Sequence, residues 1–167
     1  PADDVIMLTR DGRAMRFAAA EVRRMGRQAT GVRGIRLREG DEVVSLDAVD
    51  DGKTLFIATA NGFGKRCEFK DFTRHSRGGQ GMIGIKGADR NGAVVAAHAV
   101  SDDESIICMT SDQMMVRSRV ADFQVQSRLA RGVRLVRLNE GATLVSVSVC
   151  ESAEEPAAEP PASPEAQ

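Results

Sequence analysis

A basic, glycine-rich segment lies near the middle of this chain, and its residue types are suited to binding phosphate. Residues 74–86 read RHSRGGQGMIGIK, with Arg, Lys and His side chains set among glycines. Glycine-rich loops bind phosphate through backbone N–H groups, and arginine-rich segments bind nucleic acid. The segment lacks the GxxxxGK[ST] spacing of a nucleotide-binding loop. It could therefore be a phosphate-binding loop of another kind, a disordered Arg-Gly tract, or a basic structural turn.

Other residues that could do chemistry are few. The chain has no Tyr, only two histidines, and three widely separated cysteines, Cys67, Cys108 and Cys150. Neither histidine stands at a spacing typical of a metal site or of a catalytic triad. The segments around the cysteines resemble strand interiors, so we expect packed free thiols rather than disulfides. The sequence predicts no catalytic residue and no metal ligand.

The overall charge of −1 conceals a basic body and an acidic end. Residues 151–167 read ESAEEPAAEPPASPEAQ and contain five Glu but no Lys or Arg; without them, 23 basic residues face 19 acidic ones. Such a polar, proline-rich segment predicts a disordered tail. The tail could compete with a polyanion for the basic body, or it could act only as a solubiliser. No apolar run is long enough to span a membrane, so we expect a cytoplasmic protein.

The elements that must position the basic segment recur three times along the chain. Apolar runs end at Thr9, Thr59 and Thr110, and a glycine at residues 31, 81 and 132 opens a later strand-like run. Both sets are spaced by 50 and 51 residues. Two arginine positions follow the same period: Arg16, Arg66 and Arg117, and then Arg27, Arg77 and Arg128. Three repeats of about 50 residues are therefore present.

Each repeat predicts four antiparallel strands, as in a propeller blade. Asp11-Gly12 and Asn61-Gly62 predict two-residue type I′ turns between the first two strands. We expect an all-β array of three blades at about residues 1–50, 51–100 and 101–150, followed by the tail. A β-solenoid is the structural alternative. Three blades are fewer than a closed propeller needs, which favours an open arc, a fragment, or assembly with a second copy.

Basic residues follow the first hairpin in every repeat, so they would form a curved stripe along one rim. Such a stripe suits the phosphates of duplex nucleic acid, whereas the absence of Trp and Tyr argues against stacking on single strands. Isolated surface arginines are common, and only the recurrence favours a shared role. The predicted DNA-contacting residues are Arg24, Arg27, Arg36, Lys65, Arg66, Arg74, Arg77, Gly78, Gly79, Gln80, Lys86, Arg128, Arg131 and Arg137.

The middle repeat resembles a known family. TLFIATANGFGKRCEFKDF, SRGGQGMIGIK and DRNGAVVAAHAV are similar to the C-terminal domain of the bacterial DNA gyrase A protein. The resemblance covers residues 1–150, which correspond to the last three of that domain's six blades, and the acidic tail also fits. The resemblance implies a β-pinwheel, in which neighbouring blades exchange a strand, and a non-catalytic module that wraps duplex DNA around a basic rim to support negative supercoiling. It also implies partners in the rest of the gyrase A protein and in the gyrase B protein, with ATP and Mg²⁺ bound there and no cofactor here.

One departure from the family pattern bears on wrapping. The family's wrapping motif has the form QRRGGxG, and Ser76-Arg77-Gly78-Gly79-Gln80-Gly81 matches only its Arg-Gly-Gly-x-Gly core. We expect this loop to be an auxiliary contact. Two alternatives stay open: the corresponding domain of topoisomerase IV, which presents DNA without wrapping it, and a propeller that docks a protein. Strand exchange also predicts an unpaired sheet edge, with reduced stability or dimerisation.

Overall fold

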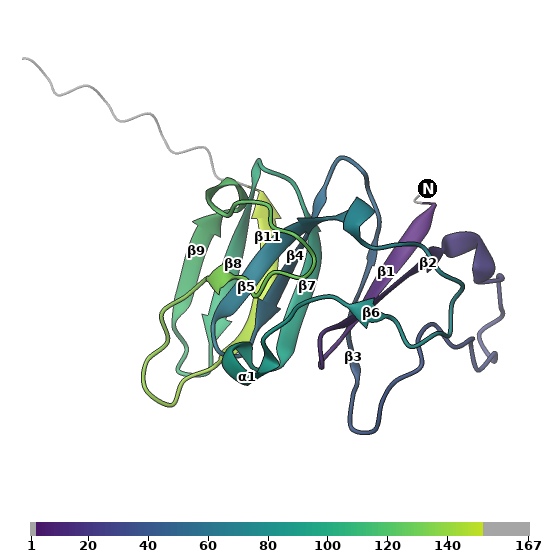
Figure 1. Ribbon diagram of the computed structural model, residues 1–167, viewed down its shortest axis with the longest axis horizontal. Helices are drawn as coiled ribbons and strands as arrows, with labels where there is room; N and C mark the ends of the chain where they lie inside the picture. Colours follow the sequence, from purple (N-terminus) through teal and green to yellow (C-terminus); the bar gives the residue numbers. More distant parts are fainter. Residues whose placement is uncertain (1–2, 152–167) are drawn as a thin grey trace, which may run out of the picture.

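The computed structural model describes residues 3–151, so the predicted tail at 151–167 lies almost entirely outside the described residues. Within this range the chain forms three antiparallel sheets arranged side by side (Figure 1). The all-β prediction is confirmed, and the only α-helix among residues 3–151 is the single turn α1, Ala88–Asn91. No helix in this range is long and apolar enough to cross a membrane.

The elements follow the threefold repeat. The first repeat contains β1 (Asp4–Thr9), β2 (Arg13–Ala18), η1 (Ala19–Glu21) and β3 (Val43–Ala48). The second contains β4 (Thr54–Thr59), β5 (Phe63–Glu68), η2 (Phe69–Asp71), β6 (Met82–Ile83), α1 and β7 (Val94–Val100). The third contains β8 (Glu104–Thr110), β9 (Met115–Arg119), η3 (Val120–Asp122), β10 (Val133–Arg134) and β11 (Leu144–Glu151).

Neighbouring repeats exchange a strand. The first sheet has the order β3-β1-β2-β6, so its outer strand comes from the second repeat. The second sheet, β10-β5-β4-β7, takes its outer strand from the third repeat in the same way, while the third sheet, β11-β8-β9, has three strands. This arrangement differs from four strands within each repeat. Residues 31–37, predicted as the third strand of the first repeat, form no strand among the described residues.

Most of the core lies in two layers between the sheets. Ile6 and Leu8 of β1 pack against Leu55 and Ile57 of β4. On the other face of β4, Phe56 packs with Ile106 of the third sheet. Because successive residues of a strand point to opposite faces, the middle sheet is apolar on both sides. This explains why TLFIAT reads as a continuous buried run rather than an alternating one.

The hairpin turns differ from the predicted type. Gly12 N–H donates to the Thr9 carbonyl at 2.9 Å, and Gly62 makes the matching bond to Thr59 at 3.0 Å. Only the glycine of each turn has a positive φ, whereas a type I′ turn needs two such residues. The prediction of type I′ turns is therefore wrong. In the third repeat Gln113 occupies the glycine position, with a φ of 67°.

Candidate nucleic-acid interface

The glycine-rich segment runs from the first joint between sheets into β6. Arg74 forms a parallel bridge with Arg16 of β2, and the His75 N–H donates to the Arg16 carbonyl at 2.9 Å. The chain then turns through Gly78 and Gly81, whose φ angles of 81° and 66° lie in the left-handed region. The segment is thus an ordered turn attached to the neighbouring repeat and not a disordered tract.

Close packing explains the glycines of this turn. A β-carbon at Gly81 would lie 2.6 Å from the carbonyl oxygen of Ala14, and one at Gly79 would lie 2.8 Å from the Met15 Cε. The side chains of His75, Ser76 and Gln80 are exposed beside them. Together these residues line a shallow hollow: Met15, His75, Ser76, Gly79, Gln80 and Gly81. Its exposed polar groups could bind an oxyanion.

Lys65 and Arg66 were predicted to contact DNA, but the structure buries both side chains. Lys65 is 0% exposed, and its ammonium donates to the carbonyl oxygens of Ser127, Arg128 and Ala130. Burial lowers the pKa of Lys65, because a low-dielectric environment disfavours the charged form. The ammonium therefore fixes the loop of the next repeat and is not available to phosphate.

The Arg66 guanidinium also joins two repeats. It donates to the hydroxyl of Thr54 at 3.0 Å and to the carbonyls of Val120 and Phe123 in the third repeat at 3.1 and 3.2 Å. It also forms an ion pair with Asp102. With its donors occupied and 5% of its surface exposed, Arg66 is a structural residue.

Arg77 and Arg128 form equivalent clamps at the two joints. Arg77 donates to the carbonyls of residues 21 and 33 at 3.2 and 3.0 Å. Arg128 donates to the carbonyls of residues 71 and 83, the matching positions of the next repeat, at 3.0 and 2.6 Å. Both side chains were predicted to contact DNA. Their geometry instead explains the recurring arginine as a link between consecutive repeats.

Arg74 is held by a buried carboxylate. Asp4 accepts a hydrogen bond from the Arg74 Nε at 2.7 Å on one oxygen and from the Arg16 Nε at 2.7 Å on the other. The hydrogen bond from Arg74, followed by that from Arg16, lowers the pKa of Asp4 even though burial opposes the shift. The Arg74 side chain is 53% exposed, so part of its guanidinium still faces solvent.

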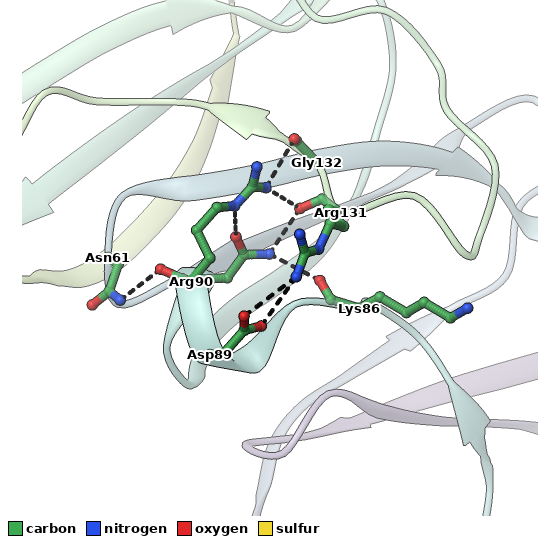
Figure 2. A network of polar contacts seen from close by, with 7 residues as sticks. Asn61, Lys86, Asp89, Arg90, Arg131 and Gly132 are labelled. Atoms are coloured by element: carbon green, nitrogen blue, oxygen red, sulfur yellow. Dashed lines mark hydrogen bonds and ion pairs between the residues drawn. The ribbon is translucent and has the colours of Figure 1, made fainter.

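The remaining predicted cations lie on the surface. Arg36 is adjacent to the glycine turn, since its N–H donates to the Gly79 carbonyl at 2.7 Å. Figure 2 shows the Lys86 side chain pointing away from the polar network to which its backbone carbonyl belongs. Arg131 in the same view forms an ion pair with Asp89 at 3.3 Å. The exposed members of the predicted set are Arg24, Arg27, Arg36, Arg74, Lys86, Arg131 and Arg137.

The network around Asn91, which includes the Lys86 carbonyl, was not predicted from the sequence (Figure 2). Asn91 is 1% exposed, and its amide donates to the carbonyls of Lys86 and Arg131 at 3.0 and 2.7 Å. Arg90 lies over the Phe63 ring, 4.4 Å from the centroid, and also bonds the Arg131 carbonyl. The sequence contains one sign of this network: the second repeat has Asn91 at the position where the first and third repeats have Glu39 and Glu140.

The cysteines are packed free thiols, as predicted. Cys67 and Cys108 are buried, and desolvation raises their pKa values to about 12 and about 11. His98 is half-buried, with its Nε2 2.9 Å from the Val147 carbonyl, whereas His75 is exposed. Among residues 3–151, no group of three or more His, Cys, Asp and Glu side chains could hold a metal ion.

Comparison with known families identifies the repeat. The family described as DNA gyrase C-terminal domain, beta-propeller, matches residues 3–50, 53–101 and 104–151. The chain belongs to this family. Three family repeats thus coincide with the three segments that exchange strands in the structure. The predicted membership of the gyrase A C-terminal domain family is confirmed.

Known relatives agree with this assignment. The A subunit of DNA gyrase from Escherichia coli K12 is 40% identical over 145 residues, which cover 87% of this chain and 17% of the relative. The same subunit from Chlamydia pneumoniae is 42% identical over 153 residues, covering 91% of this chain and 18% of the relative. This chain therefore spans less than a fifth of the length of these relatives.

Solved structures share the fold. A structure of the DNA gyrase A C-terminal domain superposes with a TM-score of 0.81 at 34% identity, covering 89% of this chain and 50% of the other. The C-terminal domain of DNA topoisomerase IV superposes with a TM-score of 0.84 at 23% identity, covering 90% of this chain and 47% of the other. The second likeness shows the fold alone.

Proposed function

We propose that this chain is a non-catalytic module that binds and wraps duplex DNA for a gyrase. The supporting observation is a set of exposed cations that have no ion pair or side-chain hydrogen bond among the described residues. They belong to outer segments of all three repeats: Arg24, Arg27, Arg36, Lys86 and Arg137. The recurring cations at the joints are excluded from this set, because they bind backbone carbonyls.

Phosphate contacts would supply the affinity. A cation that neutralises a DNA phosphate releases a condensed counterion, so affinity falls steeply with salt. Smooth bending of 20–30 base pairs costs on the order of 1–6 kcal/mol, and several such contacts are needed to offset it. The exposed turn at Gly79-Gln80 would add backbone and amide donors. In this role the turn is an auxiliary contact between the cations of adjacent repeats.

We base the proposed partners and cofactors on the family to which the chain belongs. We assign duplex DNA, the rest of the gyrase A protein and the gyrase B protein as partners. ATP and Mg²⁺ would bind to those other parts, with no cofactor on this chain. DNA cleavage by a tyrosine would likewise occur elsewhere, since this chain has no Tyr.

The affinity of the full chain for a duplex at two salt concentrations tests DNA binding. The triple variant Arg36→Gln, Lys86→Gln, Arg137→Gln should bind more weakly, with a salt dependence shallower by about 0.9 for each phosphate that is no longer neutralised. A matched control with the same loss of charge is Arg10→Gln, Lys70→Gln, Arg119→Gln, because these cations are paired with Glu42, Glu68 and Asp122. Equal weakening in both variants, or no binding at low salt, contradicts the proposal.

Wrapping needs its own readout. Nicked circular plasmid is sealed by ligase in the presence of the chain and then deproteinised. Wrapping fixes a change of linking number that grows with protein concentration, whereas binding without wrapping leaves the distribution of topoisomers unchanged. The second outcome would favour presentation of DNA without wrapping, as in the topoisomerase IV alternative.

A further inference from the structure

Among residues 3–151, the third sheet has a different outer edge from the other two. In the first two sheets, the second strand of the hairpin is covered by an outer strand from the following repeat, β6 or β10. In the third sheet, β9 is the outer edge (Figure 1). A strand edge of this kind can pair with any free strand of suitable shape unless the protein prevents it.

The two joints depend on small residues at two positions of the hairpin. The first position is the turn glycine: a β-carbon at Gly62 would lie 2.7 Å from the carbonyl oxygen of Val136, and one at Gly12 would lie 3.1 Å from the Ile85 side chain. Because the incoming segment passes so close, a β-carbon would clash with backbone at Gly62 and would be tightly packed at Gly12. Both glycines also have a positive φ, which residues with a β-carbon rarely adopt.

The second position lies two residues further on. It is Ala14 in the first repeat and Gly64 in the second. A β-carbon at Gly64 would lie 2.5 Å from the Leu135 Cδ1 and would also clash with the Ile57 carbonyl. In return, the incoming Gly132 lies against the Gly64 backbone so closely that it too tolerates no β-carbon. The joint is therefore a contact of backbone against backbone.

The third hairpin carries large side chains at both positions. Gln113 replaces the turn glycine and keeps its left-handed backbone, with a φ of 67°. Met115 replaces Ala14 and Gly64, and it is 62% exposed. By the geometry of the second joint, the β-carbon of Gln113 would stand where the carbonyl of an incoming strand approaches. The Met115 side chain would fill the place of the incoming leucine.

The joint arginine is redirected as well. Arg16 and Arg66 donate to the carbonyls of Phe69 and Val120 in the 3₁₀ turn of the following repeat, at 2.9 and 3.1 Å. Arg117, at the same repeat position, donates instead to the carbonyl of Glu151 in its own sheet, at 2.8 Å. The guanidinium that would bind a further repeat is thus used locally.

From these contacts we infer that the third sheet is a terminal cap, in which Gln113 and Met115 prevent β9 from accepting the outer strand of another repeat. The inference does not depend on DNA binding. The relevant competing strand is present in every copy of the chain. Residues 31–37, GVRGIRL, match the sequence pattern of the strand-donating segment GVRLVRL, and nothing lies within 4 Å of a β-carbon placed at Gly31. Without the cap, copies would associate head to tail into rings or open chains.

Sedimentation velocity on the full chain, at rising concentrations, tests the cap. The wild-type chain should stay monomeric, while Gln113→Gly with Met115→Gly, which restores the pattern of the second repeat, should associate. Gln113→Gly with Met115→Ala restores the pattern of the first repeat and should associate too. Adding Gly31→Ala to either variant should abolish association, because the donating strand would then clash as Gly81 and Gly132 would.

Each result decides the inference. Circular dichroism identifies any variant that does not fold, and the other double variant then carries the test. Folded double variants that remain monomeric at all concentrations overturn the inference. So does a wild-type chain that associates, or an association that survives Gly31→Ala.

Discussion

At the scale of single residues, Asp4 connects two repeats through one buried carboxylate. It binds Arg16 of its own repeat and Arg74 of the next. Asp4→Asn should destabilise the chain by about 1–3 kcal/mol, since buried donors lose a charged acceptor. Urea unfolding at neutral pH measures this loss. Asp3→Asn, at an exposed neighbouring carboxylate, is the control and should change stability by less than about 0.5 kcal/mol.

The same carboxylate predicts a dependence of stability on acid. The hydrogen bonds from Arg74 and Arg16 lower the pKa of Asp4 below its ordinary value of 3.8. Its contribution is therefore fully present above that ordinary pKa and is lost as the pH falls through the lower folded value. The difference in unfolding free energy between wild type and Asp4→Asn should shrink as the pH falls below 3.8. A constant difference down to the lowest pH would contradict this role of the carboxylate.

Cys67 and Cys108 predict a change at the opposite end of the pH range. Burial raises their pKa values to about 12 and about 11, so the folded state favours the neutral thiols. Their contribution to stability is present below the ordinary thiol pKa of 9.0 and is lost as the pH rises through the folded values.

At a pH of about 8, just below the ordinary thiol pKa, a thiol reagent should modify the half-buried Cys150 before the buried Cys67 and Cys108. Rapid modification of Cys67 in the native chain would show that the joint opens.

At the scale of elements, Arg128 shows how a joint is held. Arg128→Lys removes the planar fork that reaches two carbonyls, and a loss of about 1–3 kcal/mol is expected from unfolding curves. Arg27→Lys is a matched control at the same repeat position, because Arg27 is exposed. Its effect should stay within about 0.5 kcal/mol. Equal losses in both variants would refute a clamp role.

The sequence predicts the elements of this fold better than their connections. The spacing of Thr9, Thr59 and Thr110 predicts the three hairpins, because that period follows local strand and turn chemistry. It does not reveal which sheet receives the strand at Gly81, since pairing depends on contacts between repeats. The resemblance to a family that exchanges strands supplied that information. The prediction of type I′ turns was wrong because only the glycine in each Asp-Gly or Asn-Gly pair has a positive φ.

Predicting the candidate site was harder than predicting the fold. Recurrence predicted Arg77 and Arg128 as DNA contacts, but the period alone cannot distinguish a cation that binds phosphate from one that binds backbone carbonyls. Lys65 is the clearest case. The residue belongs to a KRC segment that could be an exposed basic strand, yet its side chain is fully buried. Loop position does not separate the two classes either, because the exposed Arg36 and Lys86 lie in the same loops as Arg77 and Arg128.

At the scale of the whole molecule, acidic residues near the exposed cations should limit DNA binding. Asp89→Asn removes the partner of Arg131 and frees its guanidinium. We expect duplex affinity at low salt to rise by up to about fivefold, since an exposed ion pair is worth about 0.2–1 kcal/mol. Asp122→Asn, which frees Arg119, is the control. Unchanged affinity for Asp89→Asn would place Arg131 away from the DNA path.

Strand exchange also sets the order in which the chain can finish folding as it leaves the ribosome. The first hairpin is complete by Ala18, but its outer strand is β6, which ends at Ile83. Until that residue has emerged, β2 remains an uncovered edge on a nascent chain. The second sheet waits in turn for Arg134. Within residues 3–151, the first and the second sheet are thus each completed by the repeat that is synthesised after them.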